Sequence, residues 1–123
     1  MRKVKWNLFG SAHDVASWFS RNRGHIVGLT EEPTDCPLAS YLKENRPGIH
    51  DVSVGDVYTT YTNSKGETVQ LENPQWVGKF VRKVDAVCGH YICDDLYGEE
   101  EYDPAVTGRE ALDVLRNVTN YRI

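Results

Sequence analysis

The most informative segment of this sequence is Asp35-Cys36-Pro37-Leu38-Ala39-Ser40-Tyr41-Leu42. Asp35 or Cys36 can cap a helix, and a proline suits the first helical position because its missing N–H would be unpaired there. The apolar residues Leu38, Tyr41 and Leu42 follow with helical spacing, so the segment predicts a helix with one apolar face. A cysteine at the positive end of a helix is favoured as the thiolate, which makes this segment the first candidate for chemistry.

The segments on either side of this helix predict an α+β fold. Further helices are expected after Ser11, after Asn73-Pro74 and at Thr107, each before residues that form an apolar face. Residues 57–71 predict a hairpin, because two strand-like runs flank the turn-forming residues 63–66. We therefore expect about four helices packed on a small, mainly antiparallel sheet that contains this hairpin.

Length and composition are those of a single globular domain over residues 1–123. A chain of this length buries about two-thirds of its unfolded surface, so we expect it to fold without a metal or another cofactor. Three cysteines are an odd and sparse set, which is typical of reduced thiols in a cytosol. The sequence has no apolar run of membrane-spanning length and no signal-peptide pattern, so we expect a cytoplasmic protein that does not bind membranes.

The charge of the chain is unevenly distributed. Residues 88–107 contain six acidic side chains and no lysine or arginine, and removing these six acids from the net charge of −4 leaves +2 elsewhere. The lack of a large basic excess argues against general nucleic-acid binding. Three tyrosines interleave with the acids, as is common at protein interfaces. We therefore predict an acidic loop that contacts a protein partner through Tyr91, Asp94, Asp95, Tyr97, Glu99, Glu100, Glu101, Tyr102 and Asp103. The alternative is a solvated loop without a partner.

Cys36 is the candidate for a second class of function, a thiol-dependent enzyme. The helix N-terminus would lower the pKa of this thiol, and His25 or His50 could act as the base if the fold brought either close. The neighbouring carboxylate of Asp35 acts in the opposite direction, because a like charge raises a thiol pKa. The structural alternative is a cysteine that packs as a small apolar residue.

Cys88-x-His90-x-x-Cys93 is the candidate for a third function, a zinc-stabilised module. Thiolates and imidazole are the ligands that zinc prefers, and Asp94, Asp95 or Cys36 could complete a set of four. The usual paired spacing of zinc ligands is missing, so the expectation remains a fold without metal.

Five motifs follow one another between residues 24 and 118: Gly24-x-Ile26-Val27-Gly28, Asp35-Cys36-Pro37-Leu38-Ala39-x-Tyr41-Leu42, Val52-Ser53-Val54-Gly55, Trp76…Phe80-Val81…Val84-Asp85 and Val106-Thr107-Gly108…Ala111-Leu112…Leu115. In this order they resemble a group of small uncharacterised proteins of bacteria and phages. The resemblance implies no activity, and the acidic segment is not part of the shared pattern.

Charge and resemblance together predict a small intracellular, non-enzymatic protein of phage or mobile-element type. We expect it to bind a basic or nucleic-acid-handling protein through the acidic loop, and inhibition of such a protein fits the charge pattern. The sequence leaves the oligomeric state open.

Overall fold

The computed structural model of the chain describes residues 8–94 and 99–119, with the backbone alone described for residues 90–94 and 99–101. The elements follow the order α1 (Ala12–Arg21), β1 (Ile26–Leu29), α2 (Pro37–Asn45), β2 (His50–Val54), β3 (Tyr58–Thr62), β4 (Thr68–Glu72), α3 (Gln75–Val87), β5 (His90–Asp94), β6 (Glu99–Asp103), β7 (Ala105–Thr107) and α4 (Gly108–Thr119). None of the helices in this part of the chain is long and apolar enough to cross a membrane.

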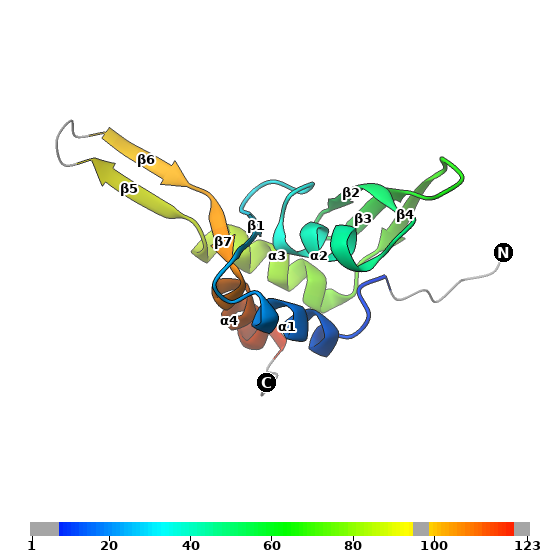
Figure 1. Ribbon diagram of the computed structural model, residues 1–123, viewed down its shortest axis with the longest axis horizontal. Coiled ribbons are helices and arrows are strands. Elements are labelled where there is room, and N and C mark those ends of the chain that lie inside the picture. Colours follow the sequence, from blue (N-terminus) through cyan, green and yellow to red (C-terminus); the bar gives the residue numbers. More distant parts are fainter. Residues whose placement is uncertain (1–7, 95–98, 120–123) are drawn as a thin grey trace.

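The predicted α+β class is confirmed, with four helices and only antiparallel strand pairs among the described residues. The predicted hairpin over residues 57–71 is strands β3 and β4, in which Tyr61 lies opposite Val69. The strands are divided over three small sheets, with orders β2-β3-β4, β1-β7 and β5-β6. The β1–β7 pair joins segments from opposite halves of the chain, which local sequence patterns do not predict (Figure 1).

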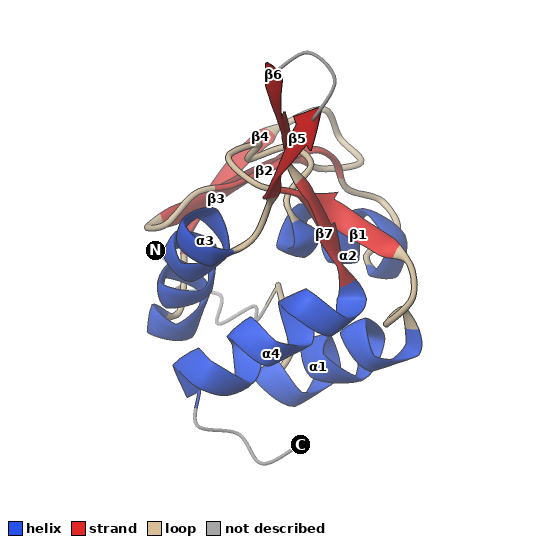
Figure 2. Cartoon of the chain, turned by 90° about the vertical axis from the view of Figure 1, so that its left-hand side faces the viewer, coloured by secondary structure: helices blue, strands red, loops and turns tan. Residues whose placement is uncertain are grey.

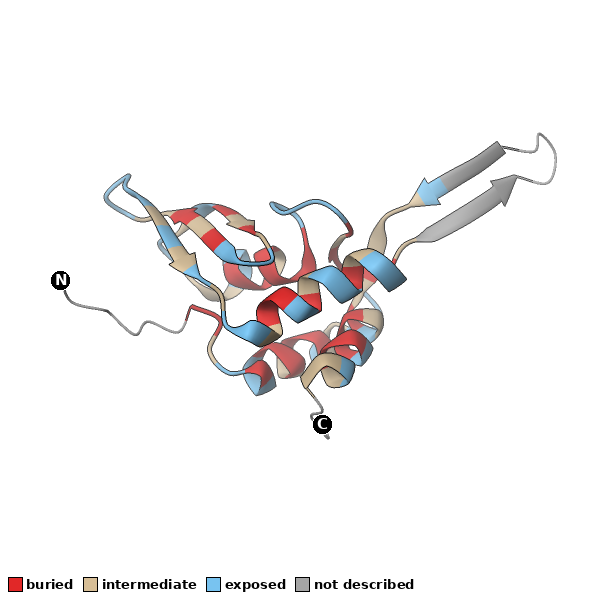
Figure 3. Ribbon diagram, turned by 180° about the vertical axis from the view of Figure 1, so that it is seen from behind, coloured by how far each residue is buried: buried red, intermediate tan, exposed pale blue. Residues whose placement is uncertain are grey.

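The hydrophobic core lies where the helices meet one another and the three-stranded sheet (Figure 3). Helices α1 and α4 lie side by side, and α4 also contacts α3 (Figure 2). Phe19 of α1 stacks on Phe80 of α3 with ring centroids 5.7 Å apart, and Trp18 meets Tyr41 of α2 edge-on at 5.8 Å. Such aromatic pairs contribute about 1 kcal/mol each beyond the burial of their area.

Gly28 allows β1 to lie directly against the start of α2. A Cβ atom at this position would lie 2.4 Å from the backbone nitrogen of Pro37 and 2.8 Å from the carbonyl oxygen of Asp35. The same contact is held by a hydrogen bond from the Leu29 N–H to that carbonyl, at 2.8 Å. Two of the motifs noted in the sequence, the one ending in Gly28 and the one beginning at Asp35, are therefore packed backbone to backbone.

The acidic segment is a hairpin of strands β5 and β6, whereas the sequence analysis expected a loop. Its register places Tyr91 opposite Tyr102 and Asp94 opposite Glu99. The high charge of this segment suggested a loop, but the hydrogen bonds of an antiparallel pair satisfy the backbone whatever side chains it carries. The connection at residues 95–98 lies outside the described residues.

Candidate functional site

The most prominent surface feature is the two-stranded hairpin of β5 and β6, here called the acidic arm. It leaves the body at the C-terminal end of α3 and projects away from it (Figures 1 and 2). An isolated two-stranded hairpin is marginally stable in water. The arm therefore depends on its attachment to the body for a defined direction.

Tyr102 attaches the arm to the body. Its hydroxyl lies 2.6 Å from the hydroxyl of Thr30, a residue that is only 2% exposed. The Thr30 N–H donates to the carbonyl of Pro104 at 2.9 Å. Both the side chain and the backbone of Thr30 therefore bind the end of the arm to the body. The Tyr102 ring lies over Gly89, where a Cβ atom would approach the phenol oxygen to 2.3 Å. Gly89 also has a φ of +88°, so glycine is favoured there for two independent reasons.

Asp103, at the end of the arm, also has a structural contact. Its Oδ1 accepts a hydrogen bond from the Ala105 N–H at 3.0 Å and so holds the bend around Pro104. Two of the nine residues predicted to contact a partner, Tyr102 and Asp103, thus help to position the arm. Five others, Tyr91, Asp94, Glu99, Glu100 and Glu101, lie on its two strands, and Asp95 and Tyr97 lie outside the described residues.

Tyr102→Phe is expected to loosen the arm and to lower the free energy of unfolding of the chain. The change leaves the buried Thr30 hydroxyl without this partner, which costs about 1–3 kcal/mol for a buried polar group. Hydrogen exchange measured by mass spectrometry should show faster exchange in residues 99–103 than in the helices. The control is Tyr58→Phe, because Tyr58 is about half exposed. Equal exchange of the arm in Tyr102→Phe and in the unchanged protein would contradict the anchoring role.

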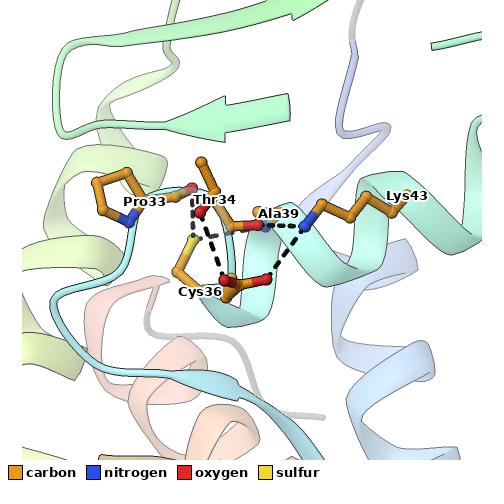
Figure 4. Close-up of polar contacts among 6 residues, drawn as sticks. Pro33, Thr34, Cys36, Ala39 and Lys43 are labelled. Atoms are coloured by element: carbon orange, nitrogen blue, oxygen red, sulfur yellow. Dashed lines mark hydrogen bonds and ion pairs between the residues drawn. The ribbon is translucent and has the colours of Figure 1, made fainter. Parts of the chain in front are cut away.

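Cys36 is the N-cap residue of α2, as the sequence predicts for Asp35 or Cys36 (Figure 4). Its Sγ accepts a hydrogen bond from the Ala39 N–H at 3.4 Å and donates to the carbonyl of Pro33 at 3.9 Å. Lys43, about two helical turns after Cys36, donates to the Thr34 carbonyl and pairs with Asp35, with 3.3 Å between Nζ and Oδ1. The thiol is thus part of a local network that starts the helix.

Burial raises the pKa of the Cys36 thiol to about 11, and the nearby charge of Asp85 adds to this effect. The backbone N–H groups of Ala39 and Leu38 favour the thiolate, but their effect is smaller than that of burial. The helix N-terminus thus lowers the pKa of this thiol as expected, but burial outweighs it, because the residue is only 6% exposed. Among the described residues, no histidine hydrogen-bonds to this thiol.

A pocket of about 260 Å³ lies beside Cys36. Val54, Val81 and Cys36 form part of its apolar wall. Its acidic residues come from the segment after β1, the β2–β3 turn and α3, namely Glu31, Glu32, Asp56 and Asp85. Because these residues are far apart in the sequence, no motif pointed to the pocket.

Two contacts organise this pocket. Glu31 has a left-handed φ of 60°, and its N–H donates to Asp85 Oδ1 at 2.9 Å. Arg82 is the one basic residue among those that line the pocket, and its Nη1 lies 3.7 Å from Asp56 Oδ2. The carboxylates outnumber the cation, so the pocket suits a positively charged group with an apolar stem. Glu31 follows directly after Thr30, so the pocket adjoins the base of the acidic arm.

Cys88, the first residue of the suggested zinc motif, is the C-cap of α3 and is 7% exposed. Burial raises the pKa of its thiol to about 11, with smaller contributions from Glu110 and Asp85. His90 and Cys93 lie in β5, and their side chains are outside the described part of the structure. Within the residues whose side chains are described, no group of three suitable side chains could hold a metal ion. Folding without metal stays a prediction.

Comparisons with known protein families, with curated proteins and with solved structures find no match to this chain. The resemblance to small bacterial and phage proteins therefore stays an expectation.

Proposed function

We propose that this chain is a small cytoplasmic, non-enzymatic interaction protein of phage or mobile-element type, which binds a basic partner protein through the acidic arm. One observation carries the proposal. A projecting hairpin, fastened to the body through Tyr102, has a sequence with acidic residues and no lysine or arginine.

Charge is the main physical reason for a basic partner. The two strands of the arm carry Asp94, Glu99, Glu100, Glu101 and Asp103. A concentrated negative charge on a projecting element attracts a positively charged surface and speeds association, and added salt weakens the attraction. The carboxylates of the adjoining pocket extend the negative surface onto the body. A nucleic-acid-handling protein offers the basic surface required, and an arm bound there would block its access to nucleic acid.

Nothing in the described residues favours an enzyme over this proposal. The thiols of Cys36 and Cys88 are both buried and have pKa values near 11, so neither is an activated nucleophile at neutral pH. Cys36 borders the acidic pocket, but its raised pKa keeps the thiol mostly protonated at neutral pH.

The triple variant Glu99→Gln, Glu100→Gln, Glu101→Gln is expected to fold normally and to lose its partner. Surface substitutions of this kind usually change stability by less than about 0.5 kcal/mol each. The loss of three negative charges should sharply reduce capture of basic proteins by the immobilised chain from a bacterial extract. Capture by the unchanged chain should also fall as salt is raised.

The matched control removes the same charge elsewhere. Glu44, Glu67 and Glu72 are exposed residues outside the arm, and replacing all three with Gln lowers the net negative charge equally. Capture by this control should resemble that of the unchanged protein. If the arm variant is folded and captures the same basic proteins as the control, the arm is not the binding surface.

A further inference from the structure

A groove between α3 and α4 has the opposite charge to the acidic arm. It has a volume of about 430 Å³ and is lined by Lys79, Arg82, Lys83, Ala86, Asn117 and Val118. Three of these residues are basic and none is acidic. From the sequence alone, Lys79, Arg82 and Lys83 are expected to form the solvated face of a helix.

The positive charge of this groove is only partly compensated. Arg82 pairs with Asp56 at 3.7 Å, and within the described residues neither Lys79 nor Lys83 forms an ion pair. Lys79 and Lys83 are one helical turn apart, and like charges at this spacing destabilise a helix slightly. A negatively charged occupant would relieve this repulsion.

We propose that the groove between α3 and α4 receives the acidic arm of a second copy of this chain. The inference rests on the proposed function in one respect, that the arm is a binding element, and it names the partner as the same protein. The arm carries five acidic residues on its two described strands, and the groove carries three basic residues. Each chain therefore holds both halves of a complementary pair.

The geometry makes this contact intermolecular. The arm continues from the C-terminal end of α3 and points away from the body, so it does not lie along the groove of its own chain (Figures 1 and 2). Two copies related by a twofold axis can exchange arms and make the same contact twice. Each arm would then be supported by the other molecule, which matters because a two-stranded ribbon is marginally stable alone.

Charge favours a second copy over nucleic acid as the occupant of the groove. A nucleic acid in the groove would pair with the three basic residues but would leave the acidic arm of the chain without a basic partner. A second copy brings an acidic arm to the groove and a basic groove to the arm, so both charges are neutralised in one complex.

The test measures self-association by sedimentation velocity at rising protein concentration and low salt. One variant reverses the charge of the arm with Glu99→Lys, Glu100→Lys and Glu101→Lys. The other reverses the charge of the groove with Lys79→Glu and Lys83→Glu. The unchanged protein should self-associate. Each variant alone should associate more weakly by at least about a hundredfold, because like charges then face each other. An equimolar mixture of the two variants should restore association, because the reversed arm matches the reversed groove.

Lys65→Glu, in the exposed turn between β3 and β4, is the control for charge and should associate as the unchanged protein does. Circular dichroism establishes that each variant is folded. If the arm variant does not fold, the groove variant decides, since Lys79 and Lys83 are exposed on a helix.

Three results would overturn the inference. They are an unchanged protein that stays monomeric throughout, a folded groove variant that associates normally, and a mixture of folded variants that stays monomeric. Binding of a DNA or RNA duplex that is lost with Lys79→Glu and Lys83→Glu, by a monomeric protein, would assign the groove to nucleic acid instead. The proposed function is judged separately by the glutamine variants, through the capture of basic proteins other than this chain.

Discussion

Gly28→Ala is expected to destabilise the chain by at least about 3 kcal/mol, or to prevent folding. The added Cβ would lie 2.4 Å from the Pro37 nitrogen and 2.6 Å from the Cys36 carbonyl carbon. Both are backbone atoms, so no side-chain rotation can relieve the clash, and β1 must move away from α2. Thermal unfolding followed by circular dichroism should show a Tm lower by about 10 °C or more.

Gly24→Ala is the matched control for this prediction. Gly24 is exposed and a Cβ atom there would have nothing within 4 Å, so the stability should stay the same or rise slightly. A Tm for Gly28→Ala within a few degrees of that for Gly24→Ala would show that β1 and α2 are not packed as described. The fold would then lack the close approach between the two sequence motifs.

The thiols of Cys36 and Cys88 are expected to react very slowly in the native protein. A pKa of about 11, compared with an ordinary 9.0, lowers the thiolate fraction at neutral pH about a hundredfold, and burial restricts access further. Alkylation with iodoacetamide, followed by peptide mapping, should therefore be at least about a hundredfold slower than after unfolding in guanidinium. Peptide mapping separates both thiols from Cys93.

The alkylation experiment also decides the enzyme hypothesis. Rapid alkylation of native Cys36 at neutral pH would indicate a low pKa and favour a thiol-dependent enzyme. The unfolded chain is the internal control, since its thiols react at the rate of ordinary cysteines.

The same pKa values predict how stability depends on alkaline pH. The folded state holds the protons of the two thiols more tightly than the unfolded state does. Their contribution to the free energy of unfolding is fully present below pH 9.0. This contribution is lost as pH rises from 9.0 through about 11, because the unfolded chain gives up these protons first. Burial also raises the pKa of Tyr41 and Tyr61, which extends the loss to higher pH. Denaturant unfolding at pH 8 and pH 10.5 measures the difference, and equal stability at both would contradict the raised pKa values.

The helix starts and the turn could be predicted from the sequence because they depend on neighbouring residues. Ser11 and Asp14 form a capping box at the expected helix start, with hydrogen bonds of 2.9 and 3.2 Å between side chain and backbone. Thr107 and Glu110 exchange the same two hydrogen bonds at the start of α4, each at 3.2 Å. The carboxamide of Asn63 accepts from two backbone N–H groups within the predicted turn. These hydrogen bonds join residues two to four positions apart, so a local sequence pattern is enough to predict them.

The properties of the candidate site depend on residues that meet only in the folded chain. The position of Cys36 at the start of α2 was predictable, but its raised pKa comes from burial under segments distant in the sequence. The acids of residues 94–103 were visible, yet their ordering as a projecting arm depends on Tyr102 reaching Thr30 and lying over Gly89. The basic groove exists only because α4 packs beside α3. The local sequence pattern thus determines the helices, the strands and the distribution of charge. The burial of Cys36, the attachment of the arm and the formation of the groove depend on long-range packing, because only the fold brings the residues involved together.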